Sequence, residues 1–399
     1  MTAEEFCRRF GVERRGTDCV KWDALEARFG DPGLLPMWIA DMEFKAPEQT
    51  VAALQARAAH GAFGYTFTPD SYYRAFIGWE KRRHGYEIKK EWLRFATGVV
   101  SALYWLVGGF TAPGDAVAVM TPVYYPFHSA VRDNGRRLVC SALVNTDGAY
   151  TVDFARLERD LAENAVKMLI LCSPHNPVGR VWTEDELDRL LDICLKHRVL
   201  VVSDEIHQDL VTGENKHVPS AIVSGGKYAH NVITLNAPSK TFNLAGLLNS
   251  HVVIEDDGLR RKYDAETGKI DRRAGNIMGL AAGEAAYAYG EDWLDGLLAT
   301  VRENDEYLRR RLKAEAPELI VSPLEGTYLA WLDLRAYLRP DEVADFIGKR
   351  CRLAVDYGEW FGARCEGFIR LNLATLPEHV RRAADSLSEN LKAHGKSAG

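Results

Sequence analysis

The sequence has no surplus of basic residues, no paired cysteines and no hydrophobic run long enough to cross a membrane. Its 50 lysines and arginines are outnumbered by 56 aspartates and glutamates, which gives a net charge of −6. A chain without a basic surplus is not expected to bind nucleic acid or an anionic membrane surface. The amino terminus carries charges where a secretory signal peptide has an apolar core, so we expect a cytoplasmic protein.

The seven cysteines are scattered, odd in number and without a CxxC pair. A chain of 399 residues can bury a large core without disulfide bridges, so reduced thiols are expected. The most apolar window lies at residues 95–114, but its apolar part, 99–110, is too short to span a bilayer. We therefore expect a buried helix there.

The hydrophobic pattern predicts alternating strands and helices between residues 93 and 254. Several of the short apolar runs are apolar on both faces, which is typical of buried parallel strands. Between two of them, Thr183 and Glu186 have the spacing of a capping box and are followed by leucines at helical period. Repeated βα units predict an α/β fold with a doubly wound, mostly parallel sheet. The expected strands are 93–96, 116–120, 168–172, 200–203, 232–236 and 251–254.

The pattern changes after about residue 290, where a long charged helix is expected at 291–316. We interpret the part that follows, completed by the amino-terminal segment, as a smaller α+β domain. The predicted division is a large domain at 46–285 and a small domain formed by 1–45 and 286–399. The expected elements of the small domain are a strand in 326–333, a helix near 341–350, a strand at 367–373 and a closing helix from Pro377.

The most informative stretch is 232–243, in which an apolar strand is followed by Ser239 and Lys240. Open α/β folds bind their ligands at the carboxyl ends of the strands. A lone lysine after a strand is ordinarily a solvated surface residue. Small residues and a proline precede this one, however, which favours a tight, buried turn. A buried lysine loses its proton easily and becomes a nucleophile toward an aldehyde.

Two further polar residues, Asp204 and Asn176, follow apolar strands at the same predicted edge. A carboxylate is costly to bury without a partner, so Asp204 needs either a protonated pyridine nitrogen or an arginine. An amine, a carboxylate and an amide on one rim match what pyridoxal phosphate (PLP) requires. The lysine forms the Schiff base, the carboxylate keeps the pyridine nitrogen protonated, and the amide bonds the phenolic oxygen.

A metal site is the alternative for the acidic segment that contains Asp204, Glu205, His207 and Asp209. Strand alternation sends Asp204 and Glu205 to opposite faces, and no second histidine lies at ligand spacing. We therefore expect no metal.

Residues 97–103 place a glycine and a serine where a strand turns into an apolar helix. Free backbone amides at that helix start, in the region of Val100 and Ser101, would hold a dianion such as a phosphate. Tyr124 follows the strand at 116–120 and is placed to stack on a pyridine ring, with plain packing as the alternative.

Together these residues resemble the fold-type-I PLP-dependent enzymes, the class I/II aminotransferase superfamily, over nearly the whole chain. The resemblance includes an Asn-Pro-x-Gly turn at Asn176 and implies an aspartate-aminotransferase-like large domain. It implies that Asn176 binds the phenolic oxygen and Asp204 the pyridine nitrogen. Lys240 would form the Schiff base, Ser239 would bind the phosphate, and Tyr124 would stack on the ring.

The resemblance also implies two roles that motifs alone do not suggest. Tyr65 matches a tyrosine that reaches the phosphate of the neighbouring subunit, which implies a homodimer with an active site shared across the interface. Arg370 matches the arginine that binds the substrate α-carboxylate. A structural ion pair is the alternative for Arg370. An arginine among Phe, Ile and Leu is costly without an anion, which favours the substrate carboxylate.

Within the superfamily the chain is most similar to the cystathionine β-lyase branch, the MalY/PatB-type C–S lyases. The segments that carry this similarity are 38–44, 204–207, 239–246 and 326–333. Two positions depart from the general aminotransferase pattern. His207 stands where most members carry a tyrosine that bonds the phenolic oxygen, which favours the lyase branch. Leu248 stands where many carry a phosphate-binding arginine, so the phosphate would rest on the helix amides, Ser239 and Tyr65.

The implied activity is the cleavage of L-cystathionine or a related cysteine S-conjugate to a thiol, pyruvate and ammonia, with Lys240 as the base at Cα. An aminotransferase of an L-amino acid with the same residues is one alternative. A regulatory protein that retains PLP and acts through a partner surface is another. No motif separates the lyase from the aminotransferase.

Overall fold

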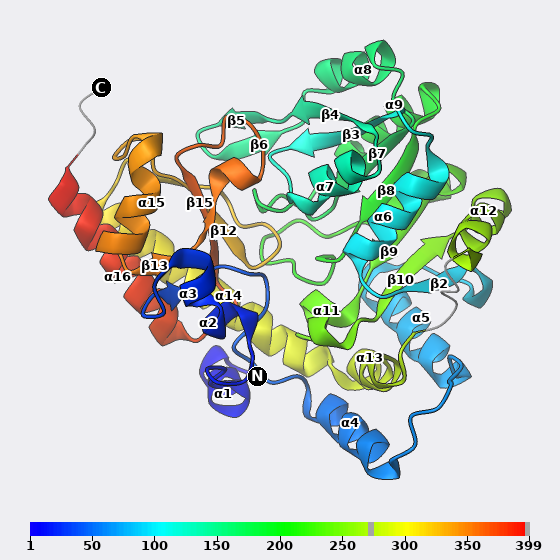
Figure 1. Ribbon diagram of the computed structural model, residues 1–399, viewed down its shortest axis with the longest axis horizontal. Helices are drawn as coiled ribbons and strands as arrows, with labels where there is room; N and C mark the ends of the chain where they lie inside the picture. Colours follow the sequence, from blue (N-terminus) through cyan, green and yellow to red (C-terminus); the bar gives the residue numbers. More distant parts are fainter. Residues whose placement is uncertain (270–274, 396–399) are drawn as a thin grey trace.

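A seven-stranded sheet forms the centre of the protein, for which a computed structural model describes residues 1–269 and 275–395 (Figure 1). Its strand order is β2-β10-β9-β8-β7-β3-β4. All neighbours from β9 to β4 are parallel, whereas β10 is antiparallel to both β9 and β2. The doubly wound, mostly parallel sheet is therefore confirmed. The strands are β2 (Leu93–Ala96), β3 (Ala116–Thr121), β4 (Arg137–Ala142), β7 (Met168–Cys172), β8 (Leu200–Asp204), β9 (Val232–Asn236) and β10 (Ser250–Ile254).

Helices cover both faces of this sheet because its strands are apolar on both sides. In β3, Val117 and Val119 pack into one apolar cluster, while Ala118 and Met120 pack into another on the opposite face. The first cluster includes residues of α6 (Val99–Phe110), α7 (Pro126–Asp133) and α12 (Asp257–Gly268). The second includes residues of α5 (Asp70–His84), α8 (Phe154–Glu163), α9 (Glu184–Lys196) and α13 (Ile277–Tyr289).

Two helices test the sequence patterns directly. Helix α9 begins with the expected capping box, in which Thr183 Oγ1 accepts from the Glu186 backbone N–H and the Glu186 side chain accepts from the Thr183 N–H. Helix α6 occupies the apolar window and buries Leu103, Leu106 and Val107 against the sheet. Over residues 1–269 and 275–395, no helix is both long enough and apolar enough to cross a membrane.

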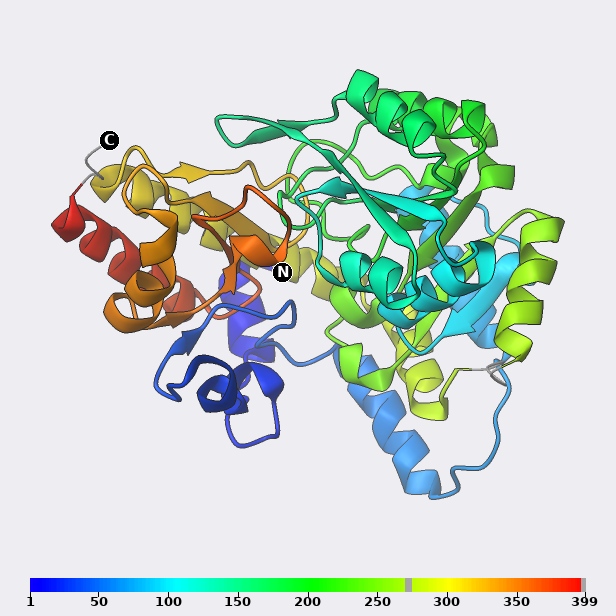
Figure 2. The same cartoon turned by 45° about the horizontal axis from the view of Figure 1, so that its top comes forward.

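A four-stranded antiparallel sheet of order β11-β12-β15-β14 lies beside the large one (Figures 1 and 2). The long helix α14 packs against α16 and against α1, and β1 pairs with β13, so the two ends of the chain meet in this part. These elements are α1 (Ala3–Phe10), β1 (Leu35–Pro36), α14 (Glu291–Glu315), β11 (Ile320–Val321), β12 (Leu329–Asp333), β13 (Leu353–Ala354), β14 (Asp356–Tyr357), β15 (Phe368–Asn372) and α16 (Pro377–His394).

The helix expected near 341–350 is confirmed as one uninterrupted helical segment, but its type changes along its length. It consists of a 3-10 turn at Pro340–Glu342, the short α15 (Val343–Asp345) and a π-helical turn at Phe346–Arg350. The π-helical turn closes with the bond from the Cys351 N–H to the Phe346 carbonyl, 3.0 Å, which periodicity does not encode. The remaining elements are α2 (Val20–Asp23), α3 (Leu25–Phe29), α4 (Glu48–His60), β5 (Val144–Thr146), β6 (Ala149–Thr151), α10 (Val223–Gly226), α11 (Pro238–Thr241) and 3-10 turns at Lys90–Trp92, Ser220–Ile222, Ala229–Asn231, Ala245–Leu247 and Gly358–Trp360.

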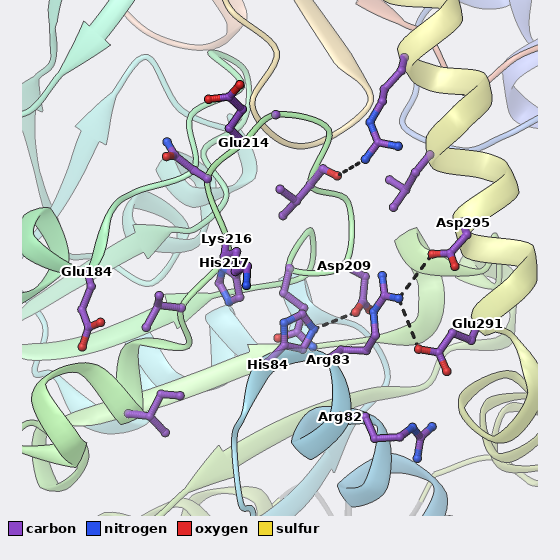
Figure 3. Close-up of a pocket in the computed structure, with 18 residues that line it drawn as sticks. Arg82, Arg83, His84, Glu184, Asp209, Glu214, Lys216, His217, Glu291 and Asp295 are labelled. Carbon is purple, nitrogen blue, oxygen red and sulfur yellow. Dashed lines mark hydrogen bonds and ion pairs between the residues drawn. The ribbon is translucent and has the colours of Figure 1, made fainter.

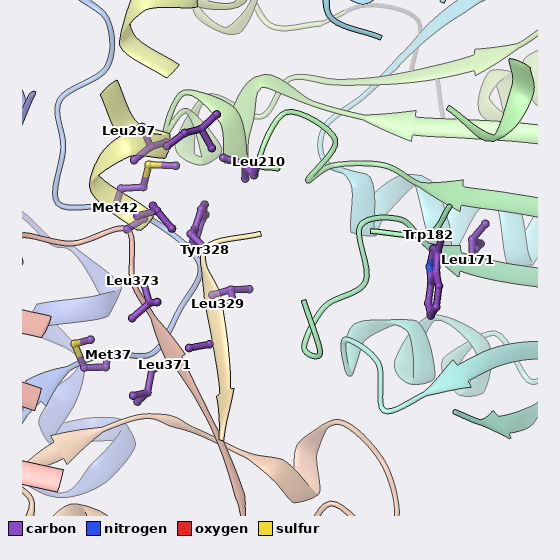
Figure 4. Packing of buried hydrophobic residues seen from close by; sticks show 14 of the residues in the cluster. Met37, Met42, Leu171, Trp182, Leu210, Leu297, Tyr328, Leu329, Leu371 and Leu373 are labelled. Atoms are coloured by element: carbon purple, nitrogen blue, oxygen red, sulfur yellow. The ribbon is translucent and has the colours of Figure 1, made fainter. Parts of the chain in front are cut away.

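One apolar cluster runs from the large sheet into the small one (Figure 4). It includes Leu171 of β7 and Trp182 as well as Tyr328, Leu329 and Leu371 around β12 and β15. This shared core holds the two sheets together at the place where the site described below lies. The exact domain boundaries stay a prediction.

Candidate active site

The carboxyl ends of β7, β8 and β9 meet at one edge of the large sheet, where a cavity of about 270 Å³ opens. Cys172 pairs with Asp204, and Asp204 pairs with Leu235, so the three strands end in register. The segments that follow them therefore carry their polar residues to the same place. The predicted residues that line the cavity are Val100, Tyr124, Asn176, Asp204, His207, Ser239, Lys240 and Arg370.

Lys240 lies in the short helix α11 directly after β9, and its Nζ donates to the Ala40 carbonyl at 2.6 Å. Burial lowers the pKa of Lys240 to about 8, although the nearby Asp41 carboxylate opposes that shift. The tight turn expected after the strand takes the form of this short helix, in which Lys240 is only partly buried. A lysine in this state is an uncharged nucleophile over much of the mildly alkaline range.

Asp204 ends β8, and its Oδ1 accepts from the Ile206 N–H at 3.1 Å. Burial raises the pKa of Asp204 to about 7. Within residues 1–269 and 275–395 no arginine pairs with it, so the described part of the chain gives no support to the arginine alternative. A cation placed beside it by a ligand would restore its ionised form.

Glu205 points away from the cavity, as strand alternation predicts. Its carboxylate accepts from Ser203 Oγ at 2.8 Å and lies 3.2 Å from His217 Nε2. In the described part of the chain, no group of three or more His, Cys, Asp or Glu side chains is arranged to hold a metal ion.

His207 and Asn176 both line the cavity, and each has a polar atom without a partner in the described part of the chain. Burial holds the pKa of His207 well below its usual value, so the ring is neutral, and its Nδ1 has no hydrogen-bond partner among the described residues. Asn176 Oδ1 accepts from Arg370 Nη1 at 2.8 Å, and no bond from its Nδ2 is formed within that same part of the chain. Buried polar atoms without partners are costly, so this wall favours a polar ligand.

The amino-terminal turn of α6 forms another end of the cavity. Gly98 precedes the helix, and Val99 and Val100 line the cavity, whereas Ser101 lies in the same turn but outside the lining. The first amides of a helix have no intrahelical acceptor, so this turn can bind an anion. Leu248 lies at the rim with a positive φ of 49°, about half exposed, and supplies no charge.

Tyr124 follows β3 and lies in the cavity wall. Burial raises the pKa of Tyr124 to about 12, so its phenol stays neutral at physiological pH.

Arg370 has a charged partner within the chain, whereas the sequence argument for a bound substrate carboxylate assumed that it had none. It lies on β15 opposite Asp356 of β14, and its Nε donates to Asp356 Oδ2 at 3.1 Å. Its Nη2 donates to the same oxygen, and both side chains are buried. The structural ion pair considered as the alternative is therefore present, and burial among apolar residues no longer argues for an external anion. Binding of a substrate carboxylate at Arg370 stays a prediction.

Sequence reasoning missed Asp356, which lines the cavity together with Arg370. The available signal was an isolated acid inside the apolar stretch 353–357. It also missed the Ala40 carbonyl, which lies beside Lys240, because a backbone acceptor leaves no trace in the choice of side chain.

Tyr65 is remote from the cavity of its own chain and fully exposed, in the irregular segment between α4 and α5. Phe63 and Phe67 beside it are also exposed. Three exposed aromatic side chains in one segment are typical of a surface that another chain covers. The predicted role of Tyr65 at a subunit interface remains a prediction.

A larger hollow of about 860 Å³ lies on the other side of the segment that follows β8 (Figure 3). Its charges neutralise one another: Arg83 pairs with Glu291 and Asp295, at 3.5 and 3.4 Å, and His84 donates to Asp209 at 2.8 Å. The lysine that lines this hollow, Lys216, is exposed, which makes the hollow a weaker candidate than the cavity at Lys240. The two are nevertheless connected, because Asp209 Oδ2 accepts from Thr241 Oγ1 at 2.8 Å.

Comparisons with known proteins agree with this geometry. Cystathionine beta-lyase PatB of Bacillus subtilis is 43% identical over 382 residues, covering 94% of this chain and 98% of the relative. A PLP-bound putative aminotransferase from Clostridium difficile has a TM-score of 0.92 at 39% identity, covering 96% of this chain and 98% of that one. Cystalysin from Treponema denticola, which contains a PLP cofactor, has a TM-score of 0.92 at 34% identity with the same coverage. The sequence model of the family "aminotransferase class I and II" matches residues 40–387, and the chain belongs to this family.

Proposed function

We propose that the protein is a PLP-dependent carbon–sulfur β-lyase that cleaves L-cystathionine or a related cysteine S-conjugate to a thiol, pyruvate and ammonia. The observation that carries this proposal is Lys240, a half-buried lysine with a lowered pKa, which lines the same cavity as the buried Asp204. The identity of 43% to a cystathionine beta-lyase over nearly the whole chain supports the choice of reaction.

The cavity fits PLP because each polar group of the cofactor finds a suitable residue. Lys240 offers an amine for the aldehyde, and Asp204 offers a carboxylate for the ring nitrogen. The Asn176 amide, whose Nδ2 has no partner in the described part of the chain, and the His207 ring line the same cavity and would supply donors to a phenolic oxygen. The amides of the first turn of α6, together with Ser239, would hold the phosphate. When bound, the cofactor supplies an electron sink for the electron pair left at Cα.

Lys240 is the residue that we assign to proton transfer. With a substrate in the cavity, its Nζ would be a suitable base for the Cα proton, because an amine of lowered pKa is uncharged more readily than an ordinary lysine. Loss of that proton allows the bond between Cβ and sulfur to break, and the sulfur leaves as a thiolate. Arg370 would orient the α-carboxylate so that the Cα–H bond faces Lys240.

Asp204 would keep the ring nitrogen protonated. An acid whose pKa is raised by burial becomes ionised when a cation is placed next to it, and the two charges then stabilise each other.

We also propose a cytoplasmic homodimer in which Tyr65 reaches the phosphate bound by the partner subunit. The exposure of Phe63, Tyr65 and Phe67 supports the interface. The seven cysteines are all free, which is typical of a reducing compartment. Sedimentation of a fully active monomer would contradict the dimer.

The test of the activity is to mix the purified protein with L-cystathionine and measure pyruvate and free thiol, with and without a 2-oxo acid as amino acceptor. We expect pyruvate and thiol in equal amounts, independent of the 2-oxo acid. Amino transfer without pyruvate would replace the lyase by an aminotransferase.

Lys240→Ala should abolish product formation and the borohydride-reducible link to PLP. Lys227→Ala removes an exposed lysine outside the cavity and should change neither product formation nor the link to PLP. A regulatory effect that persists in Lys240→Ala would instead indicate action through a partner surface.

A further inference from the structure

Asp356 is a buried acid in the cavity that the proposed reaction does not use. It is 3% exposed and lies on β14 beside Arg370. Its Oδ2 accepts from both Nε and Nη2 of Arg370. Its other oxygen, Oδ1, accepts no hydrogen bond from any residue in 1–269 and 275–395. Oδ1 is open to the cavity rather than enclosed, so water can reach it, and a ligand that displaces this water has to supply a donor in its place.

The cavity itself does not supply that donor. Lys240 Nζ is directed to the Ala40 carbonyl, and Arg370 uses Asp356 Oδ2 and Asn176 Oδ1. Tyr124 and Tyr125 line the same cavity, but neither hydroxyl donates to Asp356 in the described part of the chain. Asp204, the remaining charged group of the lining, is itself an acceptor. A ligand that fills the cavity is therefore expected to bring the donor for Oδ1.

The chemistry of the substrate indicates which ligand group remains free to act as this donor. Within the proposed function, the substrate's α-amine is joined to the cofactor and its α-carboxylate is held at Arg370. The remaining part is the substituent on sulfur. Arg370 is positively charged, whereas Asp356 and the bound α-carboxylate are both negatively charged. These three groups together therefore carry an excess of negative charge, which a cation on the sulfur substituent would neutralise.

We propose that Asp356 selects substrates whose sulfur substituent carries a cationic amine. The inference rests on the proposed lyase function and adds the substrate class to it. An ammonium group gives Oδ1 both a donor and a counter-charge. A neutral alkyl group leaves Oδ1 unpaired, and an anionic group is repelled. Thioethers that join two amino acids satisfy this requirement, because the departing half retains its own ammonium group.

The test uses two substrates of nearly equal shape, S-(2-aminoethyl)-L-cysteine and S-propyl-L-cysteine, in which an ammonium group replaces a methyl group. The release of pyruvate gives kcat/KM for each in the wild type and in Asp356→Asn, which removes the charge but keeps an acceptor for Arg370. The two thiols differ as leaving groups, so a ratio within one protein is not diagnostic by itself. For each protein, kcat/KM for S-(2-aminoethyl)-L-cysteine is divided by kcat/KM for S-propyl-L-cysteine. The diagnostic quantity is this ratio in the wild type divided by the same ratio in Asp356→Asn. We expect this quotient to be about 10 or more.

A binding measurement removes the leaving group altogether. L-Lysine and L-2-aminoheptanoate have carbon in place of sulfur and compete with substrate without elimination. We expect the wild type to bind L-lysine about tenfold more tightly than its uncharged counterpart. Equal inhibition constants in the wild type would overturn the proposal even if Asp356→Asn failed to fold.

Asp333→Asn is the matched control, because Asp333 is a buried, arginine-paired acid of the same small sheet that does not line the cavity. It should leave the substrate ratio unchanged. A uniform decrease for both substrates in Asp356→Asn would indicate that Asp356 only positions Arg370, and would overturn selection. Absence of pyruvate from either substrate in the wild type would instead contradict the lyase function itself.

Discussion

Replacing Thr241 by valine tests whether Asp209 holds the turn that carries the reactive lysine. Thr241 Oγ1 donates to Asp209 Oδ2 at 2.8 Å, while Asp209 Oδ1 accepts from Trp79 Nε1 at 3.0 Å and from His84 Nε2 at 2.8 Å. Valine has nearly the shape of threonine, so the change removes one donor from a buried carboxylate without opening a cavity. Hydrogen bonds to charged groups contribute about 1.5–3 kcal/mol, and we expect the free energy of unfolding to fall by this amount.

Thr234 offers a matched control in the strand that leads to the same turn. Thr234 and Thr241 are each 1% exposed, but Thr234 Oγ1 has no hydrogen-bond partner in the described part of the chain. Thr234→Val therefore removes an unsatisfied hydroxyl and should leave stability unchanged or raise it by about 1 kcal/mol. Urea unfolding of the two cofactor-free variants, followed by tryptophan fluorescence, should separate them by about 2 kcal/mol at equal m-values.

Thr241→Val should also affect the cavity at Lys240, because Thr241 is the next residue in the chain. Asp209 follows Asp204 by five residues, so its bond to Thr241 ties the segment that bears the acid to the segment that bears the amine. We expect Thr241→Val to slow the formation of the borohydride-reducible link to PLP. If Thr241→Val and Thr234→Val were equally stable and linked PLP at the same rate, the reasoning about Asp209 would be refuted.

Three further predictions concern the charges around the cavity. Because burial lowers the pKa of Lys240 to about 8, the rate at which cofactor-free protein links PLP should rise as pH rises through about 8, and a flat stopped-flow profile from pH 7 to 9 would contradict this. Because burial raises the pKa of Asp204 to about 7, the folded state retains a proton between pH 4 and 7 that the unfolded state has lost, so stability should decline by a few kcal/mol over this range. Asp204→Asn should reduce this decline of stability with pH, measured as the urea midpoint at each pH. An unchanged slope of the midpoint against pH would be evidence against Asp204 as its cause. Leu248→Arg adds a cation at the rim and should lower the Kd for PLP about tenfold in a spectroscopic titration; an unchanged Kd would mean that the phosphate lies elsewhere.

The large sheet and most of its site residues were predictable because the relevant signals are local in the sequence. Each parallel strand is a short apolar run, and polar residues such as Asp204 and Asn176 follow directly. In a parallel sheet the ends of neighbouring strands coincide, so the sequence alone brings Asn176, Asp204 and Lys240 together. The capping box at Thr183 was predictable for the same reason.

Features that depend on contacts between distant segments were not predictable. The direction of β10 has no signature, because an apolar run reads the same in a parallel and an antiparallel strand. The pair of Asp356 and Arg370 arises from the register of β14 on β15, which hydrophobic periodicity does not fix. The Ala40 carbonyl reaches Lys240 from a segment 200 residues away.

The two ends of the cavity come from different parts of the fold, and this division has a consequence for function. The large sheet supplies the amine of Lys240 and the acid of Asp204, which suit the cofactor. The small sheet supplies Arg370 and Asp356, which lie at the proposed substrate end. A substitution at Asp356 leaves the strands that carry Lys240 and Asp204 untouched. Substrate choice can therefore change without altering the strands that carry the proposed cofactor site, which is how one family fold can serve several reactions on amino acids.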